Sequence, residues 1–244
     1  MTAPKPLARI AGVFYLLVAI FGGFAEGFVD PKMYVAGNAA ASAANVVANA
    51  GLVRMGVVAH LLDATFFVLT AMALYALLRQ VHASMARAML VFVALSVGII
   101  TLNAVFQFEG LQVATDASYI TAFGVAGSNA LVLLLLSIEH FGILSAQVFF
   151  GLWLAPLGYL AYKSGLFPRA LGVVLVAATV CYLVDLLAAF LVPDLGAQIH
   201  APVVIVPTIG ELWMVGYLLV KGVRSSSPAA GAQVAARGQV SVAP

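Results

Sequence analysis

His60 and Asp63 lie one helical turn apart in the otherwise apolar stretch VVAHLLDATFF, residues 57–67. An imidazole nitrogen and a carboxylate oxygen are both accepted as ligands by zinc, and both side chains also take up and release protons. Residues at i and i+3 share one face of a helix, so these two side chains are expected to point the same way. The stretch therefore marks a candidate site for metal, proton or cation chemistry.

Other polar and ionisable residues occur in equally apolar surroundings. Asn103 and Gln107 are spaced i and i+4, and His140 and Gln147 lie two turns apart, so each pair shares a helix face. Together these residues define a predicted pocket for a ligand or proton. It consists of Glu26, Arg54, His60, Asp63, Asn103, Gln107, Glu139, His140, Gln147, Tyr182, Asp185 and Glu211.

The elements that position these residues are predicted to be membrane-spanning helices. Of the 244 residues, 64% are hydrophobic and 8% are charged, whereas soluble domains contain about 25% charged residues. Apolar runs long enough to cross a hydrocarbon core of about 30 Å recur along the chain, without the alternation typical of barrel strands. The sequence therefore predicts an all-α polytopic membrane protein, a six-helix transmembrane bundle. Its spans are about 8–29, 52–78, 87–109, 136–162, 169–192 and 202–221.

The basic residues predict the orientation of these spans. All of them except Lys32 and Arg54 lie near the start of the first span, bracket the second or fourth connection, or lie at or beyond the end of the sixth span. Loops rich in lysine and arginine face the cytoplasm. We therefore expect both termini to be cytoplasmic, and an even number of spans requires the termini to share a side.

Residues 1–224 are expected to form the transmembrane domain. The Ala-rich stretch 38–50 begins with Asn38, a favourable N-cap, and is predicted to be a helix at the outer surface. Residues 128–162 form an apolar run longer than a membrane requires, which predicts either an interfacial first part or a break near Gly142. Residues 225–244 are small and polar, and a disordered cytoplasmic tail is expected there.

Each predicted span contributes polar residues, and most of these fall in its outer half. An ionised side chain at the centre of a membrane helix costs about 2.5–3.5 kcal/mol on insertion scales, so these groups are expected to face the bundle interior. The sequence therefore predicts an outward-facing acidic and histidine pocket within the membrane.

Three interpretations of this pocket remain open. The first is binding or conduction of a small molecule, proton or cation, because intramembrane ionisable groups commonly mark such pathways. The second is a metal-dependent intramembrane hydrolase, with Glu139 or Glu211 as general base. In that case zinc, the one cofactor that the residues suggest, would be held by His60, Asp63, His140 and Asp185. The third is a purely structural cluster of hydrogen bonds between helices.

Four segments carry a resemblance to a known family: RIAGVFYLLVAIFGGFAEGFV (9–29), GLVRMGVVAHLLD (51–63), VFFGLWLAPLGYLAYKSGLFPRALGVVLVAATVCYLVD (148–185) and GELWMVGYLLVKGV (210–223). Over about residues 8–223 the chain resembles the bacterial domain-of-unknown-function 4386 family. The resemblance implies a multi-pass protein of the bacterial inner membrane and supplies no activity. The expected partners are the lipid bilayer and a small-molecule or ion ligand, and a formal charge of +2 gives no case for nucleic-acid binding.

Overall fold

The computed structural model describes residues 4–224, which form helices and short connections without any strand. Six helical segments are long and apolar enough to cross a membrane: Pro4–Met33, Ala50–Leu78, Ala83–Thr115, Ala117–Ser164, Arg169–Leu191 and Pro193–Val220. The predicted fold class, an all-α six-helix transmembrane bundle, is confirmed, and the chain is a multi-pass membrane protein. The tail predicted at 225–244 lies outside the described residues.

The first span contains a distorted turn. It runs through α1 (Pro4–Phe24), the π-helical turn η1 (Ala25–Val29) and α2 (Asp30–Met33). In the π turn the backbone N–H of Asp30 donates to the carbonyl of Ala25, five residues earlier. Pro31 follows directly, and its missing N–H and bulky ring disfavour regular helix geometry at this point. The helix nevertheless continues through Asp30 instead of ending before it.

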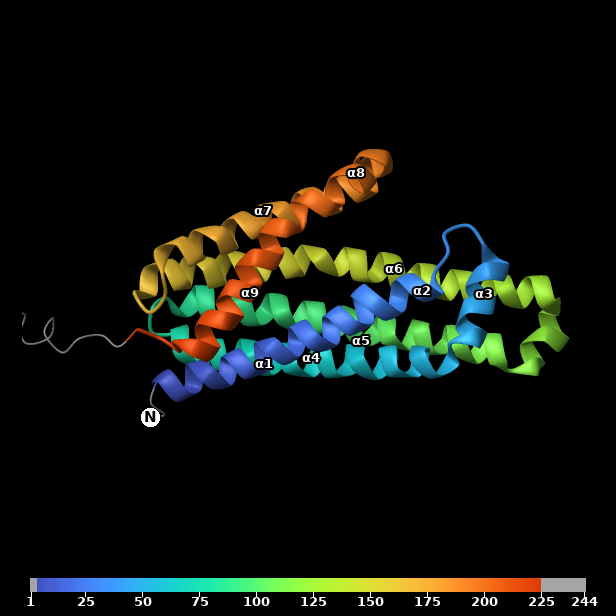
Figure 1. Ribbon diagram of the computed structural model, residues 1–244, viewed down its shortest axis with the longest axis horizontal. Coiled ribbons are helices and arrows are strands. Elements are labelled where there is room, and N and C mark those ends of the chain that lie inside the picture. Colours follow the sequence, from blue (N-terminus) through green and yellow to red (C-terminus); the bar gives the residue numbers. More distant parts are fainter. Residues whose placement is uncertain (1–3, 225–244) are drawn as a thin grey trace, which may run out of the picture.

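A short helix, α3 (Ala39–Ala48), follows the first span and packs against α5 and α6. The side-chain oxygen of Asn38 caps it by accepting a hydrogen bond from the backbone N–H of Ala41 at 3.0 Å. Figure 1 shows α3 lying across the bundle near the end opposite the start of the chain. Its position ties the connection after the first span to the long α5–α6 hairpin.

The helices α4 (Ala50–Leu78), α5 (Ala83–Thr115) and α6 (Ala117–Ser164) pack in chain order, α4 against α5 and α5 against α6. At 1.5 Å per residue α5 is about 50 Å long, which exceeds a hydrocarbon core of about 30 Å. Figure 1 shows the α5–α6 hairpin extending past the other long helices at the end opposite the start of the chain. Asp116 caps α6 by accepting a hydrogen bond from the Ser118 N–H, which holds the pKa of Asp116 below its ordinary value. The helix bends at Gly124, whose φ of 69° favours glycine, and it continues unbroken through Gly142.

The last three helices are α7 (Arg169–Leu191), α8 (Pro193–Val203) and α9 (Ile205–Val220). Figure 1 shows α7 and α8 along one side of the bundle, whereas α9 slants back across it toward the N-terminal end and packs against α1. The helices α6 and α7 approach most closely at Gly158 and Gly172, where an added Cβ on either would lie within 2.7 Å of the other's carbonyl oxygen. Small residues permit such backbone contact between membrane helices.

Buried hydrophobic side chains form two clusters, one toward each end of the bundle. The first cluster, near the termini, joins α1, α4, α5, α6, α7 and α9, and it includes Tyr15, Phe67, Val93, Trp153 and Met214. The second cluster, at the opposite end, includes Val29, Val53, Leu111, Val132 and Leu136. The helices α4, α5 and α6 contribute to both clusters. Their residues between the two clusters therefore form a middle layer of the bundle.

Candidate functional site

The middle layer of the bundle is polar. Along α4, Val53 belongs to one hydrophobic cluster, His60 and Asp63 come next, and Phe67 belongs to the other cluster. The same order recurs in α5 and α6, where the polar residues between the two clusters include Asn103, Gln107, Glu139 and Gln147. Polar side chains from separate helices therefore occupy a common level between two apolar layers.

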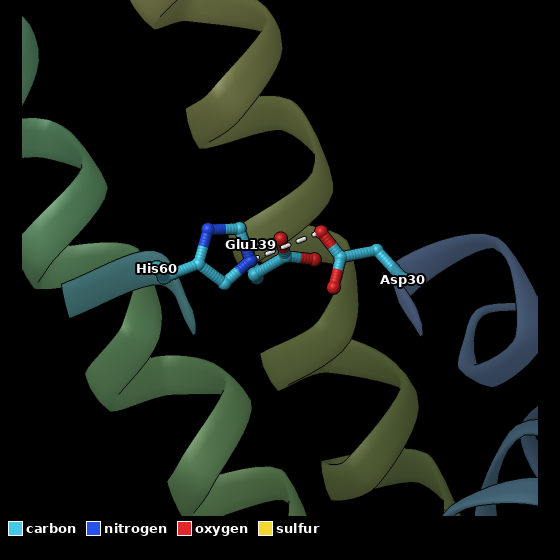
Figure 2. Close-up of side chains that lie close together, drawn as sticks. All are labelled: Asp30, His60 and Glu139. Carbon is cyan, nitrogen blue, oxygen red and sulfur yellow. Dashed lines mark hydrogen bonds and ion pairs between the residues drawn. The ribbon is translucent and has the colours of Figure 1, made fainter. Parts of the chain in front are cut away.

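Asp30, His60 and Glu139 form the tightest group in this layer. They come from α2, α4 and α6, and each offers a ligand atom within 4.8 Å of the other two. Figure 2 shows the His60 ring and the two carboxylates converging on one point. His60 and Glu139 are 1% and 3% exposed, and the Asp30 side chain is 15% exposed. The group is thus almost completely removed from solvent.

Asp30 is held from two sides. His60 Nε2 lies 3.1 Å from Asp30 Oδ2, and Gln107 Nε2 donates a hydrogen bond to Asp30 Oδ1 at 2.6 Å. Two buried atoms of the same network, His60 Nδ1 and Gln107 Oε1, have no hydrogen-bond partner among residues 4–224. Buried polar atoms are nearly always satisfied by protein, water or ligand. Ordered water or a bound ligand is therefore expected to satisfy these two atoms.

A cavity of about 350 Å³, here called the first chamber, adjoins this group. Asp30 and Glu139 contribute directly to its wall. The complete lining is Glu26, Asp30, Pro31, Tyr34, Glu139, His140, Ile143, Leu144, Gln147 and His200. Its polar members are acids, imidazoles, a tyrosine and an amide, which together favour a positively charged ligand.

A second cavity, of about 190 Å³ and here called the second chamber, lies on the other side of Glu26, which lines both. Its lining is Val18, Ala19, Gly22, Gly23, Glu26, Asp63, Phe67, Phe150, Trp153, Tyr182 and Glu211. Glu211 accepts hydrogen bonds from the hydroxyls of Tyr15 at 2.7 Å and Tyr182 at 3.0 Å. Both of its carboxylate oxygens are therefore occupied by tyrosines.

Three residues of the predicted pocket have surroundings of their own. Asp185 is 2% exposed and pairs with His200 Nδ1 at 3.0 Å. His140 is exposed at the side of the first chamber and stacks on Tyr34 with ring centroids 4.8 Å apart. Arg54 is exposed and lines an apolar groove between α1 and α4. The structure therefore places Arg54 away from the acidic residues of the polar layer.

Of the four zinc ligands expected from the sequence, His60 alone belongs to the group that it forms with Asp30 and Glu139. Asp63 lines the second chamber, whereas His140 and Asp185 have the partners just described. Asp30 follows the predicted end of the first span, so the sequence alone leaves it outside the pocket. The sequence does contain a signal that could have placed Asp30 in the pocket. Glu26 and Asp30 are four residues apart, so they share a helix face if the helix continues.

The fold and the buried polar layer define a class: a multi-pass helical membrane protein with ionisable groups enclosed between its spans. Within that class, the chain belongs to the family described as domain of unknown function (DUF4386), whose model matches residues 10–222. This agrees with the resemblance seen in the sequence. No curated protein and no solved structure matches the chain.

Proposed function

We propose that this protein binds a divalent cation of the zinc class within the membrane, through Asp30, His60 and Glu139. The observation that carries the proposal is the convergence of these three ligand atoms, from three helices, within 4.8 Å of one another. Zinc accepts imidazole nitrogen and carboxylate oxygen together, and three protein ligands leave a fourth position for water or another ligand. The first chamber supplies space for that fourth ligand.

The charge balance of the site supports the same proposal. Three carboxyl groups, those of Glu26, Asp30 and Glu139, line the first chamber, and no lysine or arginine of residues 4–224 joins them. Like charges in a weakly polar interior repel one another unless a proton or a cation neutralises them. A divalent cation would neutralise two of the carboxylates and use the imidazole at the same time.

At this site we expect a cation to bind without being conducted through the membrane. The second chamber reaches Phe67 and Trp153, which are both buried members of the hydrophobic cluster nearer the termini. An ion crossing that layer would lose its polar surroundings, which is costly in an apolar medium. The closed apolar layer therefore favours a site that is entered and left from one side.

Zinc analysis of the purified protein tests this function. Protein in detergent, incubated with zinc and then freed of excess, is expected to retain about one zinc per chain by elemental analysis. His60→Ala is expected to lose it, whereas the matched variant His140→Ala is expected to keep it, because His140 stacks on Tyr34 outside the three-residue group. A folded wild type that retains no zinc, or equal retention by His60→Ala, would refute the assignment.

A metal-dependent hydrolase is the second candidate function. The observation favouring it is Glu26, a carboxyl group in the wall of the same chamber that does not belong to the three-residue group. A carboxylate beside a metal-bound water is the arrangement of a general base in zinc hydrolysis. Hydrolysis of an ester by the zinc-loaded protein, absent from His60→Ala, would support catalysis in addition to binding.

We also propose that the protein lies in a bacterial inner membrane with both termini in the cytoplasm. This rests on the segregation of the basic residues to the loops and ends near the termini. A periplasm-dependent alkaline phosphatase fused after Arg224 should be inactive, and the same enzyme inserted at Asp116 should be active. The reverse pattern would show that the bundle has the opposite orientation.

A further inference from the structure

The second chamber combines carboxyl groups with aromatic walls. Phe67, Phe150, Trp153 and Tyr182 line it, and the rings of Phe67 and Trp153 meet edge to face with centroids 5.0 Å apart. Aromatic faces carry partial negative charge and attract cations, most strongly when water is excluded. This wall therefore differs from that of the first chamber, which contains imidazoles and an amide.

Asp63 lines this chamber and carries a buried acceptor without a donor. It is 4% exposed, and its Oδ1 has no hydrogen-bond partner among residues 4–224. Gly22 faces it, and a Cβ at Gly22 would lie 3.2 Å from that same oxygen. That oxygen therefore packs closely against Gly22, and it lacks a donor there. A buried acceptor of this kind is costly unless something donates to it.

Unlike Asp63, Glu211 has hydrogen-bond donors on both of its carboxylate oxygens. Glu211 already accepts from Tyr15 and Tyr182, so its oxygens are fixed in place. Within residues 4–224 the carboxylates of this chamber form no group with the close spacing of Asp30, His60 and Glu139. No lysine or arginine of the described chain lines the chamber to neutralise them. The chamber is therefore acidic without offering the clustered ligands that a metal ion needs.

We propose that the second chamber binds the ammonium group of a small organic amine. An N–H of the ammonium group donates to Asp63 Oδ1, and the aromatic rings surround its carbon atoms. The volume of about 190 Å³ corresponds to about six water molecules at ~30 Å³ each, which fits an amine of a few heavy atoms. This inference goes beyond cation binding at the first chamber and does not depend on it.

Titration with n-butylammonium tests the inference. The protein contains two tryptophans, so Trp213→Phe leaves Trp153 as the single reporter in the chamber wall. Saturable change in its fluorescence is expected with n-butylammonium at constant ionic strength, and none with uncharged n-butanol. Asp63→Asn, made in the same background, is expected to weaken binding more than about 10-fold, because the ammonium group loses its negatively charged partner and keeps at most a hydrogen bond to a neutral oxygen.

Two further variants separate this site from the metal site and from general destabilisation. Gly22→Ala places a methyl group beside Asp63 Oδ1 and should weaken binding, whereas Gly98→Ala, with nothing within 4 Å of its Cβ, should not. His60→Ala should retain n-butylammonium binding although it loses zinc. The inference is overturned if folded protein shows no saturable response, if Asp63→Asn binds equally well, or if sodium ions compete as effectively as the amine.

Discussion

Asp30→Asn is expected to lower the affinity for zinc by more than about 100-fold while leaving the protein folded. Asparagine keeps the shape of the side chain and can still accept the hydrogen bond that Gln107 donates to Oδ1. It removes the negative charge and the carboxylate oxygen that faces His60 Nε2. Loss of a residue that merely orients a ligand costs about 10–100-fold in metal affinity, so loss of a ligand should cost more.

The same substitution should not lower the thermal stability of the zinc-free protein. Asp30 shares the first chamber with Glu26 and Glu139, so a neutral side chain relieves repulsion between buried like charges. Zinc affinity is measured by competition with a fluorescent chelator, and stability by thermal denaturation in the presence of EDTA. The control is Glu109→Gln, which neutralises an exposed carboxylate on a different helix, α5. Unchanged zinc affinity in folded Asp30→Asn would remove Asp30 from the site.

The class of fold was predictable from composition and from the lengths of the apolar runs. A chain with 8% charged residues cannot cover a water-facing surface, and only helices suit its long apolar runs in lipid. His60 and Glu139 were expected in one pocket, but their close grouping with Asp30 was not. Sequence spacing relates residues on one helix, whereas contacts between helices depend on rotation and on packing, which no local pattern specifies.

Asp30 and Arg54 occupy positions that differ from those expected from the sequence. Asp30-Pro31 resembles the end of a helix, yet a π turn carries the first span past it and brings Asp30 into the interior. Arg54 precedes His60 by six residues, which is about 120° around a helix, so the two project from different faces. Helical spacing alone could have separated Arg54 from His60, but the spacing of a regular helix does not reveal a π turn.

Gly172→Val is expected to destabilise the bundle strongly, because it fills the closest approach between α6 and α7. A Cβ at this position would lie 2.6 Å from the carbonyl oxygen of Gly158 and 2.8 Å from the backbone nitrogen of Tyr162. Overpacking typically costs about 1–3 kcal/mol, and here backbone meets backbone, so side-chain rotation offers no relief. We expect a loss of about 3 kcal/mol or more, seen as a lower denaturation midpoint and a smaller monodisperse fraction in detergent.

Gly216→Val is the matched control, because it makes the same substitution on α9 where nothing lies within 4 Å of the added Cβ. Both variants introduce a β-branched residue into a helix, so a difference between them reports the α6–α7 contact alone. Separation of α6 from α7 would also displace Tyr182, whose Cβ lies 3.0 Å from a Cβ added at Gly151 of α6. Partly folded Gly172→Val should therefore lose amine binding before zinc binding, since Asp30, His60 and Glu139 lie outside α7. Equal stability of the two valine variants would contradict this close helix crossing.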